Sequence, residues 1–280
     1  TRSYSLTSCP GAEVAAYRIA IRRQAGGAMS GHFCALAPGD MVQTTAPDGP
    51  FTLPFENEFP VVLLAAGIGI TPFLSLLEQI AAARQGPEVH LYYGARNGAE
   101  HAFADRIATL AATCPRLTVH TFYSQPRPGD TSHTPGRLMP DHIDPALITR
   151  RARFYMCGPD AMIDSFRAHL AQAGVPAFEM FHERFAAPAP VTTGDLTPQP
   201  VTLARQNRTL QWAPEDGALL EFAEKHGLTP PAGCRTGQCE SCAVTVLAGE
   251  VGHFRAVETD DPAQCLACQA FPLGPVTLDL

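Results

Sequence analysis

The chain has 280 residues, 45% of them hydrophobic and 17% charged, a composition that is ordinary for a globular protein of two or three domains. Its formal net charge of −7 argues against a nucleic-acid partner. Because no apolar run reaches the roughly 18 residues of a membrane span, we expect no such span. The start lacks an apolar signal core, and nine is an odd number of cysteines, so we predict a cytoplasmic protein without a disulfide scaffold.

Residues 1–54 are predicted to be β-structure. Apolar and polar residues alternate over 17–22, as in a half-buried strand. A turn over 26–30 offers backbone N–H groups to a phosphate. Near the start stand three residues that could hold a phosphate, stack on a planar ring and hydrogen-bond to its edge: Arg2, Tyr4 and Ser5. Taken alone, the tetrapeptide of residues 2–5 also fits an ordinary strand.

A continuous apolar run over 61–66 is typical of a strand that is buried on both faces. Two glycines follow, Gly67 and Gly69, and then Thr71 and Pro72, which suit a helix N-cap and the first helical position. A strand, a glycine turn and a helix N-terminus form the geometry that binds a dinucleotide pyrophosphate. Pro72 stands where the usual fingerprint has its third glycine.

Strands and helices then alternate. Strands are predicted over 89–93, 117–122, 153–156 and 178–181, helices over 101–112 and 160–174, and a turn-rich excursion with a short helix over 124–145. This alternation predicts a doubly wound parallel sheet, whose ligands lie at the carboxyl ends of the strands. The segments 67–72 and 157–159 both fall at such ends.

The last part of the chain carries a cysteine motif. Four prolines in 186–200 predict a semi-rigid linker. Beyond it we predict strands over 201–205, 209–212, 243–247 and 276–280 and a helix over 218–226. Cys234, Cys239 and Cys242 have the C-x4-C-x2-C spacing of a plant-type 2Fe–2S cluster, with Cys265 or Cys268 as the fourth ligand. A zinc site or a disulfide framework is the alternative, but zinc ribbons use two C-x2-C pairs and this loop has one.

In this order the motifs resemble those of the phthalate dioxygenase reductase group, and the resemblance covers the whole chain. It implies a multidomain protein. The expected parts are a partial antiparallel β-barrel for flavin over 1–54, an α/β doubly wound pyridine-nucleotide domain over 55–185, the linker over 186–200, and an α+β β-grasp ferredoxin domain over 201–280. The first residues would fall midway through the flavin barrel.

The resemblance also implies roles for residues at a flavin. Arg2 would contact the flavin phosphate, Tyr4 would pack on the isoalloxazine ring, and Ser5 would reach its polar edge. Gly27 and Ser30 match the turn that holds the flavin phosphate. Glu183 and Phe185 match a segment that lies near the flavin and closes the nucleotide domain.

For the nucleotide, Gly67, Gly69, Thr71 and Pro72 match the family's own G-x-G-x-x-P motif. The C-G-P motif beside the nicotinamide is matched by Cys157, Gly158 and Pro159. Cys157 has no adjacent base that would support a nucleophilic role. Because Arg96 is the only basic residue directly after the second strand, we expect NADH, with NADPH as the alternative.

The family's last cysteine precedes a short turn that ends in proline, and Cys268 fits this where Cys265 does not. The family usually has glycine at the position of Glu240. The implied function is electron transfer from NADH through FAD or FMN to the 2Fe–2S cluster and on to a terminal oxygenase, Rieske-type or similar. The alternatives are an acceptor domain fused upstream and a ferredoxin-type carrier that has lost its flavin.

Overall fold

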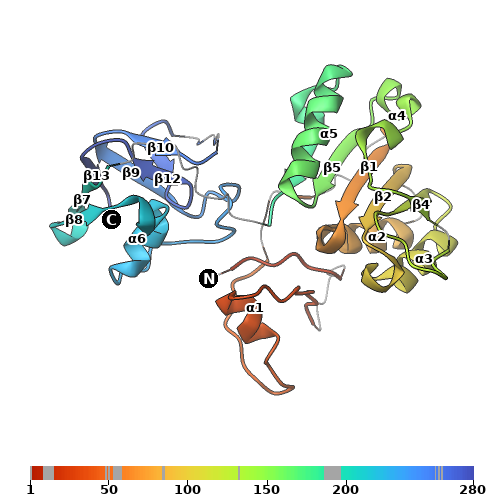
Figure 1. Ribbon diagram of the computed structural model, residues 1–280, viewed down its shortest axis with the longest axis horizontal. Helices are drawn as coiled ribbons and strands as arrows, with labels where there is room; N and C mark the ends of the chain where they lie inside the picture. The colour runs from red at the N-terminus through yellow and green to blue at the C-terminus, as the bar shows by residue number, and fades with distance from the viewer. Residues whose placement is uncertain are drawn as a thin grey trace. The chain divides into compact units, whose positions relative to one another are not determined.

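The computed structural model describes residues 2–8, 16–47, 49, 51–52, 59–83, 86–131, 133–185, 197–255, 257, 259 and 261–280 (Figure 1). The chain divides into two compact units. The first runs from Tyr4 to Arg184, and the second comprises Phe185–Leu280 with the residues up to Ser3. Among the described residues, no helix combines the length and the apolar character needed to cross a membrane.

The first unit contains a six-stranded parallel sheet with the order β4-β3-β2-β1-β5-β6. Its strands are β1 (Val61–Ala66), β2 (Val89–Ala95), β3 (Leu117–Tyr123), β4 (Thr134–Pro135), β5 (Arg153–Cys157) and β6 (Met180–Glu183). The order reverses at β1, which pairs with β2 on one side and β5 on the other. The carboxyl ends of β1 and β5 therefore form a topological switch point, where ligands of such sheets bind.

Helices cover both faces of this sheet. The helical elements are η1 (Gly67–Ile70), α2 (Thr71–Ala82), η2 (Gly98–Glu100), α3 (Ala104–Thr113), η3 (Pro140–His142), α4 (Pro145–Thr149), α5 (Asp160–Gln172) and η4 (Ala177–Glu179). Leu63 of β1 belongs to a core with Phe73 of α2, whereas the next residue, Leu64, belongs to a core with Phe166 of α5. Burial on both faces explains the continuous apolar run of β1 and confirms the doubly wound fold.

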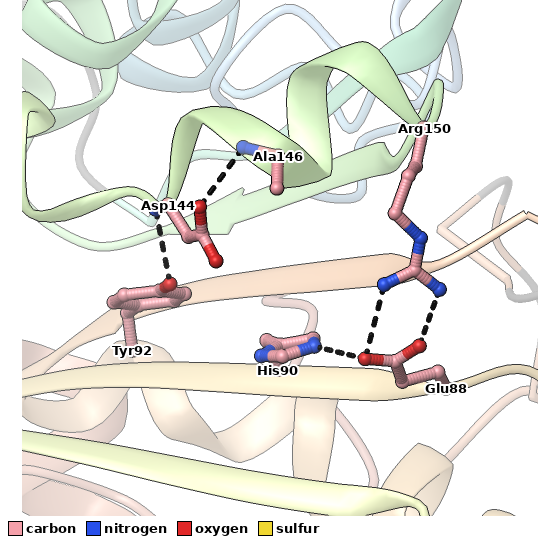
Figure 2. Close-up of polar contacts among 6 residues, drawn as sticks. All are labelled: Glu88, His90, Tyr92, Asp144, Ala146 and Arg150. Carbon is pink, nitrogen blue, oxygen red and sulfur yellow. Dashed lines mark hydrogen bonds and ion pairs between the residues drawn. The ribbon is translucent and has the colours of Figure 1, made fainter.

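Polar contacts fasten α4 over the sheet. Figure 2 shows the residues that make them: Glu88, His90, Tyr92, Asp144, Ala146 and Arg150. Asp144 caps α4 because its Oδ1 accepts a hydrogen bond of 2.9 Å from the Ala146 N–H. Hydrogen bonds from Arg150, and then from His90, lower the pKa of Glu88 to about 2. Both ends of α4 are thus tied to the sheet, because Arg150 donates to Glu88 and the Asp144 N–H donates to the Tyr92 hydroxyl of β2 at 3.4 Å.

The described residues before β1 form one helix, α1 (Ala28–Phe33), and one antiparallel bridge, between Leu6 and Ile19. Of the strand expected over 17–22, the described residues show only this bridge, at which the Thr7 N–H donates to the Arg18 carbonyl at 2.8 Å. Cys9 and the boundary expected between 54 and 55 lie outside the described residues.

The second unit contains a five-stranded mixed sheet with the order β11-β9-β13-β7-β8 and a separate pair, β10 and β12. The elements are β7 (Gln199–Leu203), η5 (Ala204–Gln206), β8 (Arg208–Trp212), η6 (Pro214–Asp216), α6 (Leu219–Lys225), β9 (Ala243–Ala248), β10 (Val251–His253), β11 (Gln264–Leu266), β12 (Ala270–Pro272) and β13 (Val276–Leu278). The first strand begins at Gln199, so the predicted linker ends earlier than 200. Its residues 186–196 lie outside the described part. A mixed sheet with one packed helix confirms the α+β expectation.

Replacing Leu220 of α6 by alanine should lower the free energy of unfolding of the second unit by about 2–5 kcal/mol, because a buried side chain would leave a cavity. Trp212 is the single tryptophan of the chain and lies in the same core, so its fluorescence in urea reports on this unit. The matched control is Leu273→Ala, at a side chain that is 55% exposed. Equal urea midpoints for the two variants would contradict this core.

Candidate functional site

Two loops meet at the switch point of the parallel sheet. One is η1, directly after β1, and the other is Cys157–Pro159, at the end of β5. A Cβ atom on Gly69 would lie 2.1 Å from the backbone oxygen of Cys157 and 2.8 Å from the nitrogen of Gly158. Since these neighbours are backbone atoms, no side chain fits at position 69. The absence of a side chain therefore brings the G-x-G-x-x-P and C-G-P motifs together.

The backbone of the glycine loop is fixed by Gly67 and Tyr93. Gly67 has a φ of +55°, a left-handed conformation that glycine adopts without strain. Its carbonyl accepts a 3.0 Å hydrogen bond from the hydroxyl of Tyr93 on β2. Burial raises the pKa of Tyr93, so the hydroxyl stays protonated and remains a donor at neutral pH. The Tyr93 hydroxyl on the neighbouring strand β2 therefore holds the glycine loop in place.

Two helices begin at this point without a side-chain cap. Thr71 is the first residue of α2 rather than its N-cap, and its hydroxyl donates to the Ile68 carbonyl at 3.0 Å. Pro72 is therefore the second residue of α2 and not the first, as was predicted. The N-cap of α5 is Pro159, which also lacks a capping side chain. At α2 the Thr71 N–H donates to the Ile68 carbonyl and Pro72 has no N–H. The N-terminus of α5 has no side-chain cap, and such a helix start suits an anionic group such as a pyrophosphate.

Cys157, at the end of β5, is fully buried in the core. Burial raises the pKa of its thiol well above the ordinary range, with the nearby Glu183 as a further cause. A thiol that stays protonated is a poor nucleophile, which agrees with the absence of a neighbouring base in the sequence. Glu183 pairs with Cys157 across β5 and β6, and its Oε2 accepts from the Ser5 hydroxyl at 3.4 Å. Two of the predicted flavin residues, Ser5 and Glu183, therefore lie together.

A cavity of about 630 Å³ lies at the turn before α1. Its lining comprises Arg23, Gln24, Ala25, Gly26, Gly27, Ala28, Gly31 and His32. Ser30 does not line it, because its hydroxyl accepts from the Gln24 N–H at 3.1 Å and donates to the Gly27 carbonyl at 3.3 Å. Tyr4 packs edge-on against Phe33, with ring centroids 5.4 Å apart.

Arg23 and His32 line this cavity, and the sequence analysis did not single them out. The signal in the sequence was the basic pair Arg22–Arg23 directly before the glycine turn. Arg2 and Phe185 are exposed residues of the second unit. The roles expected for them beside a flavin stay predictions.

Arg96 follows β2 and is surrounded by groups that the sequence did not single out. Its Nε donates to Gln125 Oε1 at 2.8 Å, and its Nη1 lies 3.9 Å from Glu100 Oε1. Asp130 accepts from the Gly98 N–H at 3.1 Å and from the Arg127 N–H at 2.7 Å. These backbone hydrogen bonds lower the pKa of Asp130, so the carboxyl is ionised at neutral pH. After the end of β2, Arg96 thus lies near the carboxylate of Glu100, and the carboxylate of Asp130 lies near Arg127 and His133.

The cysteine loop of the second unit gathers four thiols as two pairs. The thiols of Cys234 and Cys239 are hydrogen-bonded to each other, and so are those of Cys242 and Cys268. The hydrogen bond from Cys239, together with the Thr236 N–H at 3.3 Å, lowers the pKa of Cys234 to about 4. The hydrogen bond from Cys242 lowers the pKa of Cys268 to about 7. The same hydrogen bonds raise the pKa of the other member of each pair, Cys239 and Cys242.

The pairs suit a cluster of two iron atoms, because each iron needs two thiolates from the protein. Among the described residues, no three His, Cys, Asp or Glu side chains are arranged to hold a single metal ion. Cys265 lies on β11 opposite Val244 and is fully buried. Burial raises its pKa to about 11. The four paired thiols fit the cluster, and Cys265 packs in the core.

The loop bends sharply through left-handed backbone at Arg235, Gly237 and Glu240, whose φ angles are +60°, +77° and +55°. Glu240 therefore occupies a conformation that favours glycine, which fits the family's usual residue at this position. A Cβ on Gly233 would lie 2.9 Å from Cys239 Sγ, so that thiol needs a bare backbone beside it. The Arg235 guanidinium forms an ion pair with Glu224 of α6, which ties the loop to the helix.

Comparison with known proteins gives two matching families. The oxidoreductase NAD-binding domain matches residues 63–168, and the 2Fe-2S iron-sulfur cluster binding domain matches residues 201–273. An NADPH oxidoreductase of Mycobacterium tuberculosis is 32% identical over 288 residues, which cover 100% of this chain and 72% of that protein. A flavohemoprotein of Deinococcus radiodurans is 37% identical over 201 residues, which cover 69% of this chain and 49% of that protein. The chain spans about half the length of this flavohemoprotein.

Among solved structures, the chain is similar to a phthalate dioxygenase reductase described as a modular structure for electron transfer from pyridine nucleotides to 2Fe–2S. The TM-score is 0.67 at 26% sequence identity, over 100% of this chain and 83% of that one. The likeness extends over both units and not only over the part that binds the nucleotide.

Cys268→Ser should prevent the protein from holding a complete cluster, whereas Cys265→Ala should leave the cluster content unchanged. The reason is that Cys268 is paired with Cys242 and Cys265 has no cysteine partner among the described residues. Iron and acid-labile sulfide per chain, with the visible absorption of the cluster, are the measurements. A full cluster in the Cys268 variant and a lost one in the Cys265 variant would reverse the assignment.

Proposed function

The chain belongs to the phthalate dioxygenase reductase family of oxidoreductases, and on that premise we propose that it passes electrons from NADH through a flavin to a 2Fe–2S cluster and on to an oxygenase partner. The observation that carries the proposal is that one chain holds both a nucleotide crevice, where Gly69 meets Cys157, and four paired cysteines. A pyridine nucleotide delivers a hydride, which is two electrons, and the cluster accepts one. A carrier that handles both must stand between them, and flavin is that carrier.

Bound FAD or FMN would supply the exchange between two-electron and one-electron transfer. The chain's own residues would bind and orient the nucleotide and the flavin. Gly67 and Gly69 would let the backbone approach the pyrophosphate, with the uncapped start of α5 as an N–H donor. Ser5 donates to Glu183 and would present its hydroxyl at the polar edge of the flavin. The Arg23 guanidinium would offset the charge of the flavin phosphate at the cavity beside Gly27.

The second candidate acceptor is a catalytic domain in the same polypeptide. It is favoured by the likeness to a flavohemoprotein, of which this chain covers 49%. A third candidate, a carrier without flavin, would show an iron–sulfur spectrum that does not respond to NADH. For the setting we propose the cytoplasm, because nine cysteines with four claimed by a cluster fit a reducing compartment.

Cys239→Ala should abolish electron delivery to a ferredoxin-type acceptor and leave the NADH-dependent reduction of ferricyanide largely intact. The variant removes one cluster ligand and touches no residue of the nucleotide crevice. Steady-state rates with the two acceptors, measured on protein with a known flavin content, are the test. Loss of both activities in a folded, flavin-loaded variant would refute the serial path. Wild-type protein with bound flavin that NADH does not bleach would refute the proposed donor.

We propose NADH rather than NADPH as the donor on the residues around Arg96. A 2′-phosphate carries about two negative charges and needs cationic partners, as an NADP site provides. Here the guanidinium is already engaged by Gln125, and the carboxylates of Glu100 and Asp130 lie close by. The mycobacterial relative is named an NADPH oxidoreductase, so the choice depends on this chain's own side chains.

Glu100→Gln should raise kcat/KM for NADPH relative to NADH by about twofold to fivefold, the range that a partly exposed charge pair gives. The change removes a carboxylate that would repel the 2′-phosphate and frees Arg96 to meet it. The matched control is Glu215→Gln, which makes the same charge change at an exposed position in the other unit. A wild-type preference for NADPH, or an unchanged ratio in the Glu100 variant, would contradict this selectivity.

A further inference from the structure

Gln269 is a fully buried polar residue next to the last proposed ligand, Cys268. Its Nε2 lies 2.8 Å from the Cys268 carbonyl oxygen, 3.4 Å from the Arg235 carbonyl oxygen and 3.7 Å from Cys268 Sγ. All three neighbours are acceptors, so the amide group must point its NH2 and not its oxygen toward them. The NH2 group has two hydrogens for these three acceptors, so one is donated to the Arg235 carbonyl and the other is shared between the carbonyl oxygen and the Sγ of Cys268. One side chain thus donates to both ends of the cysteine site, which are 34 positions apart in the sequence.

The rest of this side chain is fixed by packing. A Cβ on Gly237 would lie 2.7 Å from the Gln269 Cγ, so the loop between Cys234 and Cys239 leaves room for the glutamine stem. The backbone N–H of Phe254 donates to the Gln269 carbonyl at 2.8 Å, and this holds the main chain of the residue. The Gln269 Oε1 atom is buried and has no hydrogen-bond partner among the described residues. The burial of an unpaired oxygen has a cost, and this cost is understandable if the NH2 group has a specific task.

We propose that Gln269 is a positioning residue that sets the reduction potential of the cluster by donating an N–H to the Cys268 sulfur. Reduction adds one electron, and therefore one negative charge, that is shared with the ligating sulfurs. A hydrogen bond to a sulfur stabilises the more negative state and raises the potential. The hydrogen bond to the Arg235 carbonyl holds the loop at the distance at which this donor works. The inference rests on the proposed cluster ligands and concerns a residue that does not ligate iron.

The test is Gln269→Met, which keeps the length and the buried volume of the side chain and removes the N–H donor. In a titration of the purified protein with dithionite and a redox dye, the equilibrium constant for one-electron reduction of the cluster should fall about threefold to tenfold, the size of one net hydrogen bond. Pulsed electron paramagnetic resonance of the reduced protein in D2O should lose one exchangeable hydrogen coupled to the cluster. The control is Gln211→Met, at an exposed side chain of β8, and neither quantity should change in this variant.

A fully loaded Gln269→Met protein with the wild-type potential and the wild-type exchangeable couplings would overturn the inference and leave the electron path standing. Absence of the cluster spectrum from the wild-type protein would instead refute the ligand set itself. If the methionine variant does not fold, Gln269→Asn keeps an amide but shortens its reach. A lowered equilibrium constant in that variant supports the role of the donor, and an unchanged one overturns it.

Discussion

The nucleotide crevice depends on one close approach, between the backbone of Gly69 and the Cys157 carbonyl. A Cβ atom at position 69 would stand 2.1 Å from that oxygen. The contact joins the ends of β1 and β5, where the strand order of the parallel sheet reverses. It also places the starts of α2 and α5, both without side-chain caps, at the same edge. The pyrophosphate site proposed at this edge therefore depends on a missing side chain rather than on an added charge.

The cysteine loop uses bare backbone in a similar way. Gly233 leaves the space that the Cys239 sulfur fills, and Gly237 leaves the space for the stem of Gln269. In both sites the chain turns through left-handed conformations, which are inexpensive for glycine and strained for other residues. Glu240 has such a conformation without being a glycine. Its strain must be offset by the packing of the loop and by the Arg235–Glu224 ion pair.

The sequence was sufficient for features whose information is local. Continuous apolar runs, glycine turns and the spacing of Cys234, Cys239 and Cys242 are each contained in a few neighbouring positions. The N-cap expected at Thr71 was wrong by one residue. A 3-10 turn precedes α2, and the Thr71 hydroxyl donates to the Ile68 carbonyl of that turn. The contacts of Arg96 with Gln125 and of Gln269 with Arg235 were not predictable, since they join segments 29 and 34 positions apart. The strand predicted over 17–22 is reduced to one bridge, and the sequence could not show this, because a strand also needs hydrogen bonds from a second segment.

The cysteines show that the surroundings of a thiol, and not the residue type, determine the direction in which its pKa shifts. Burial raises the pKa of the Cys157 and Cys265 thiols, and for Cys265 it outweighs a hydrogen bond from the residue's own backbone. Cys234 is also partly buried, but a neighbouring thiol and the Thr236 N–H lower its pKa to about 4. The pKa shifts alone do not separate the ligands from the other cysteines, because the hydrogen bond within each pair raises the pKa of one partner, Cys239 in the first pair and Cys242 in the second. The pairing does separate them, since the Cys268 thiol lies beside that of Cys242, whereas Cys265 lies on β11 opposite Val244 in the core.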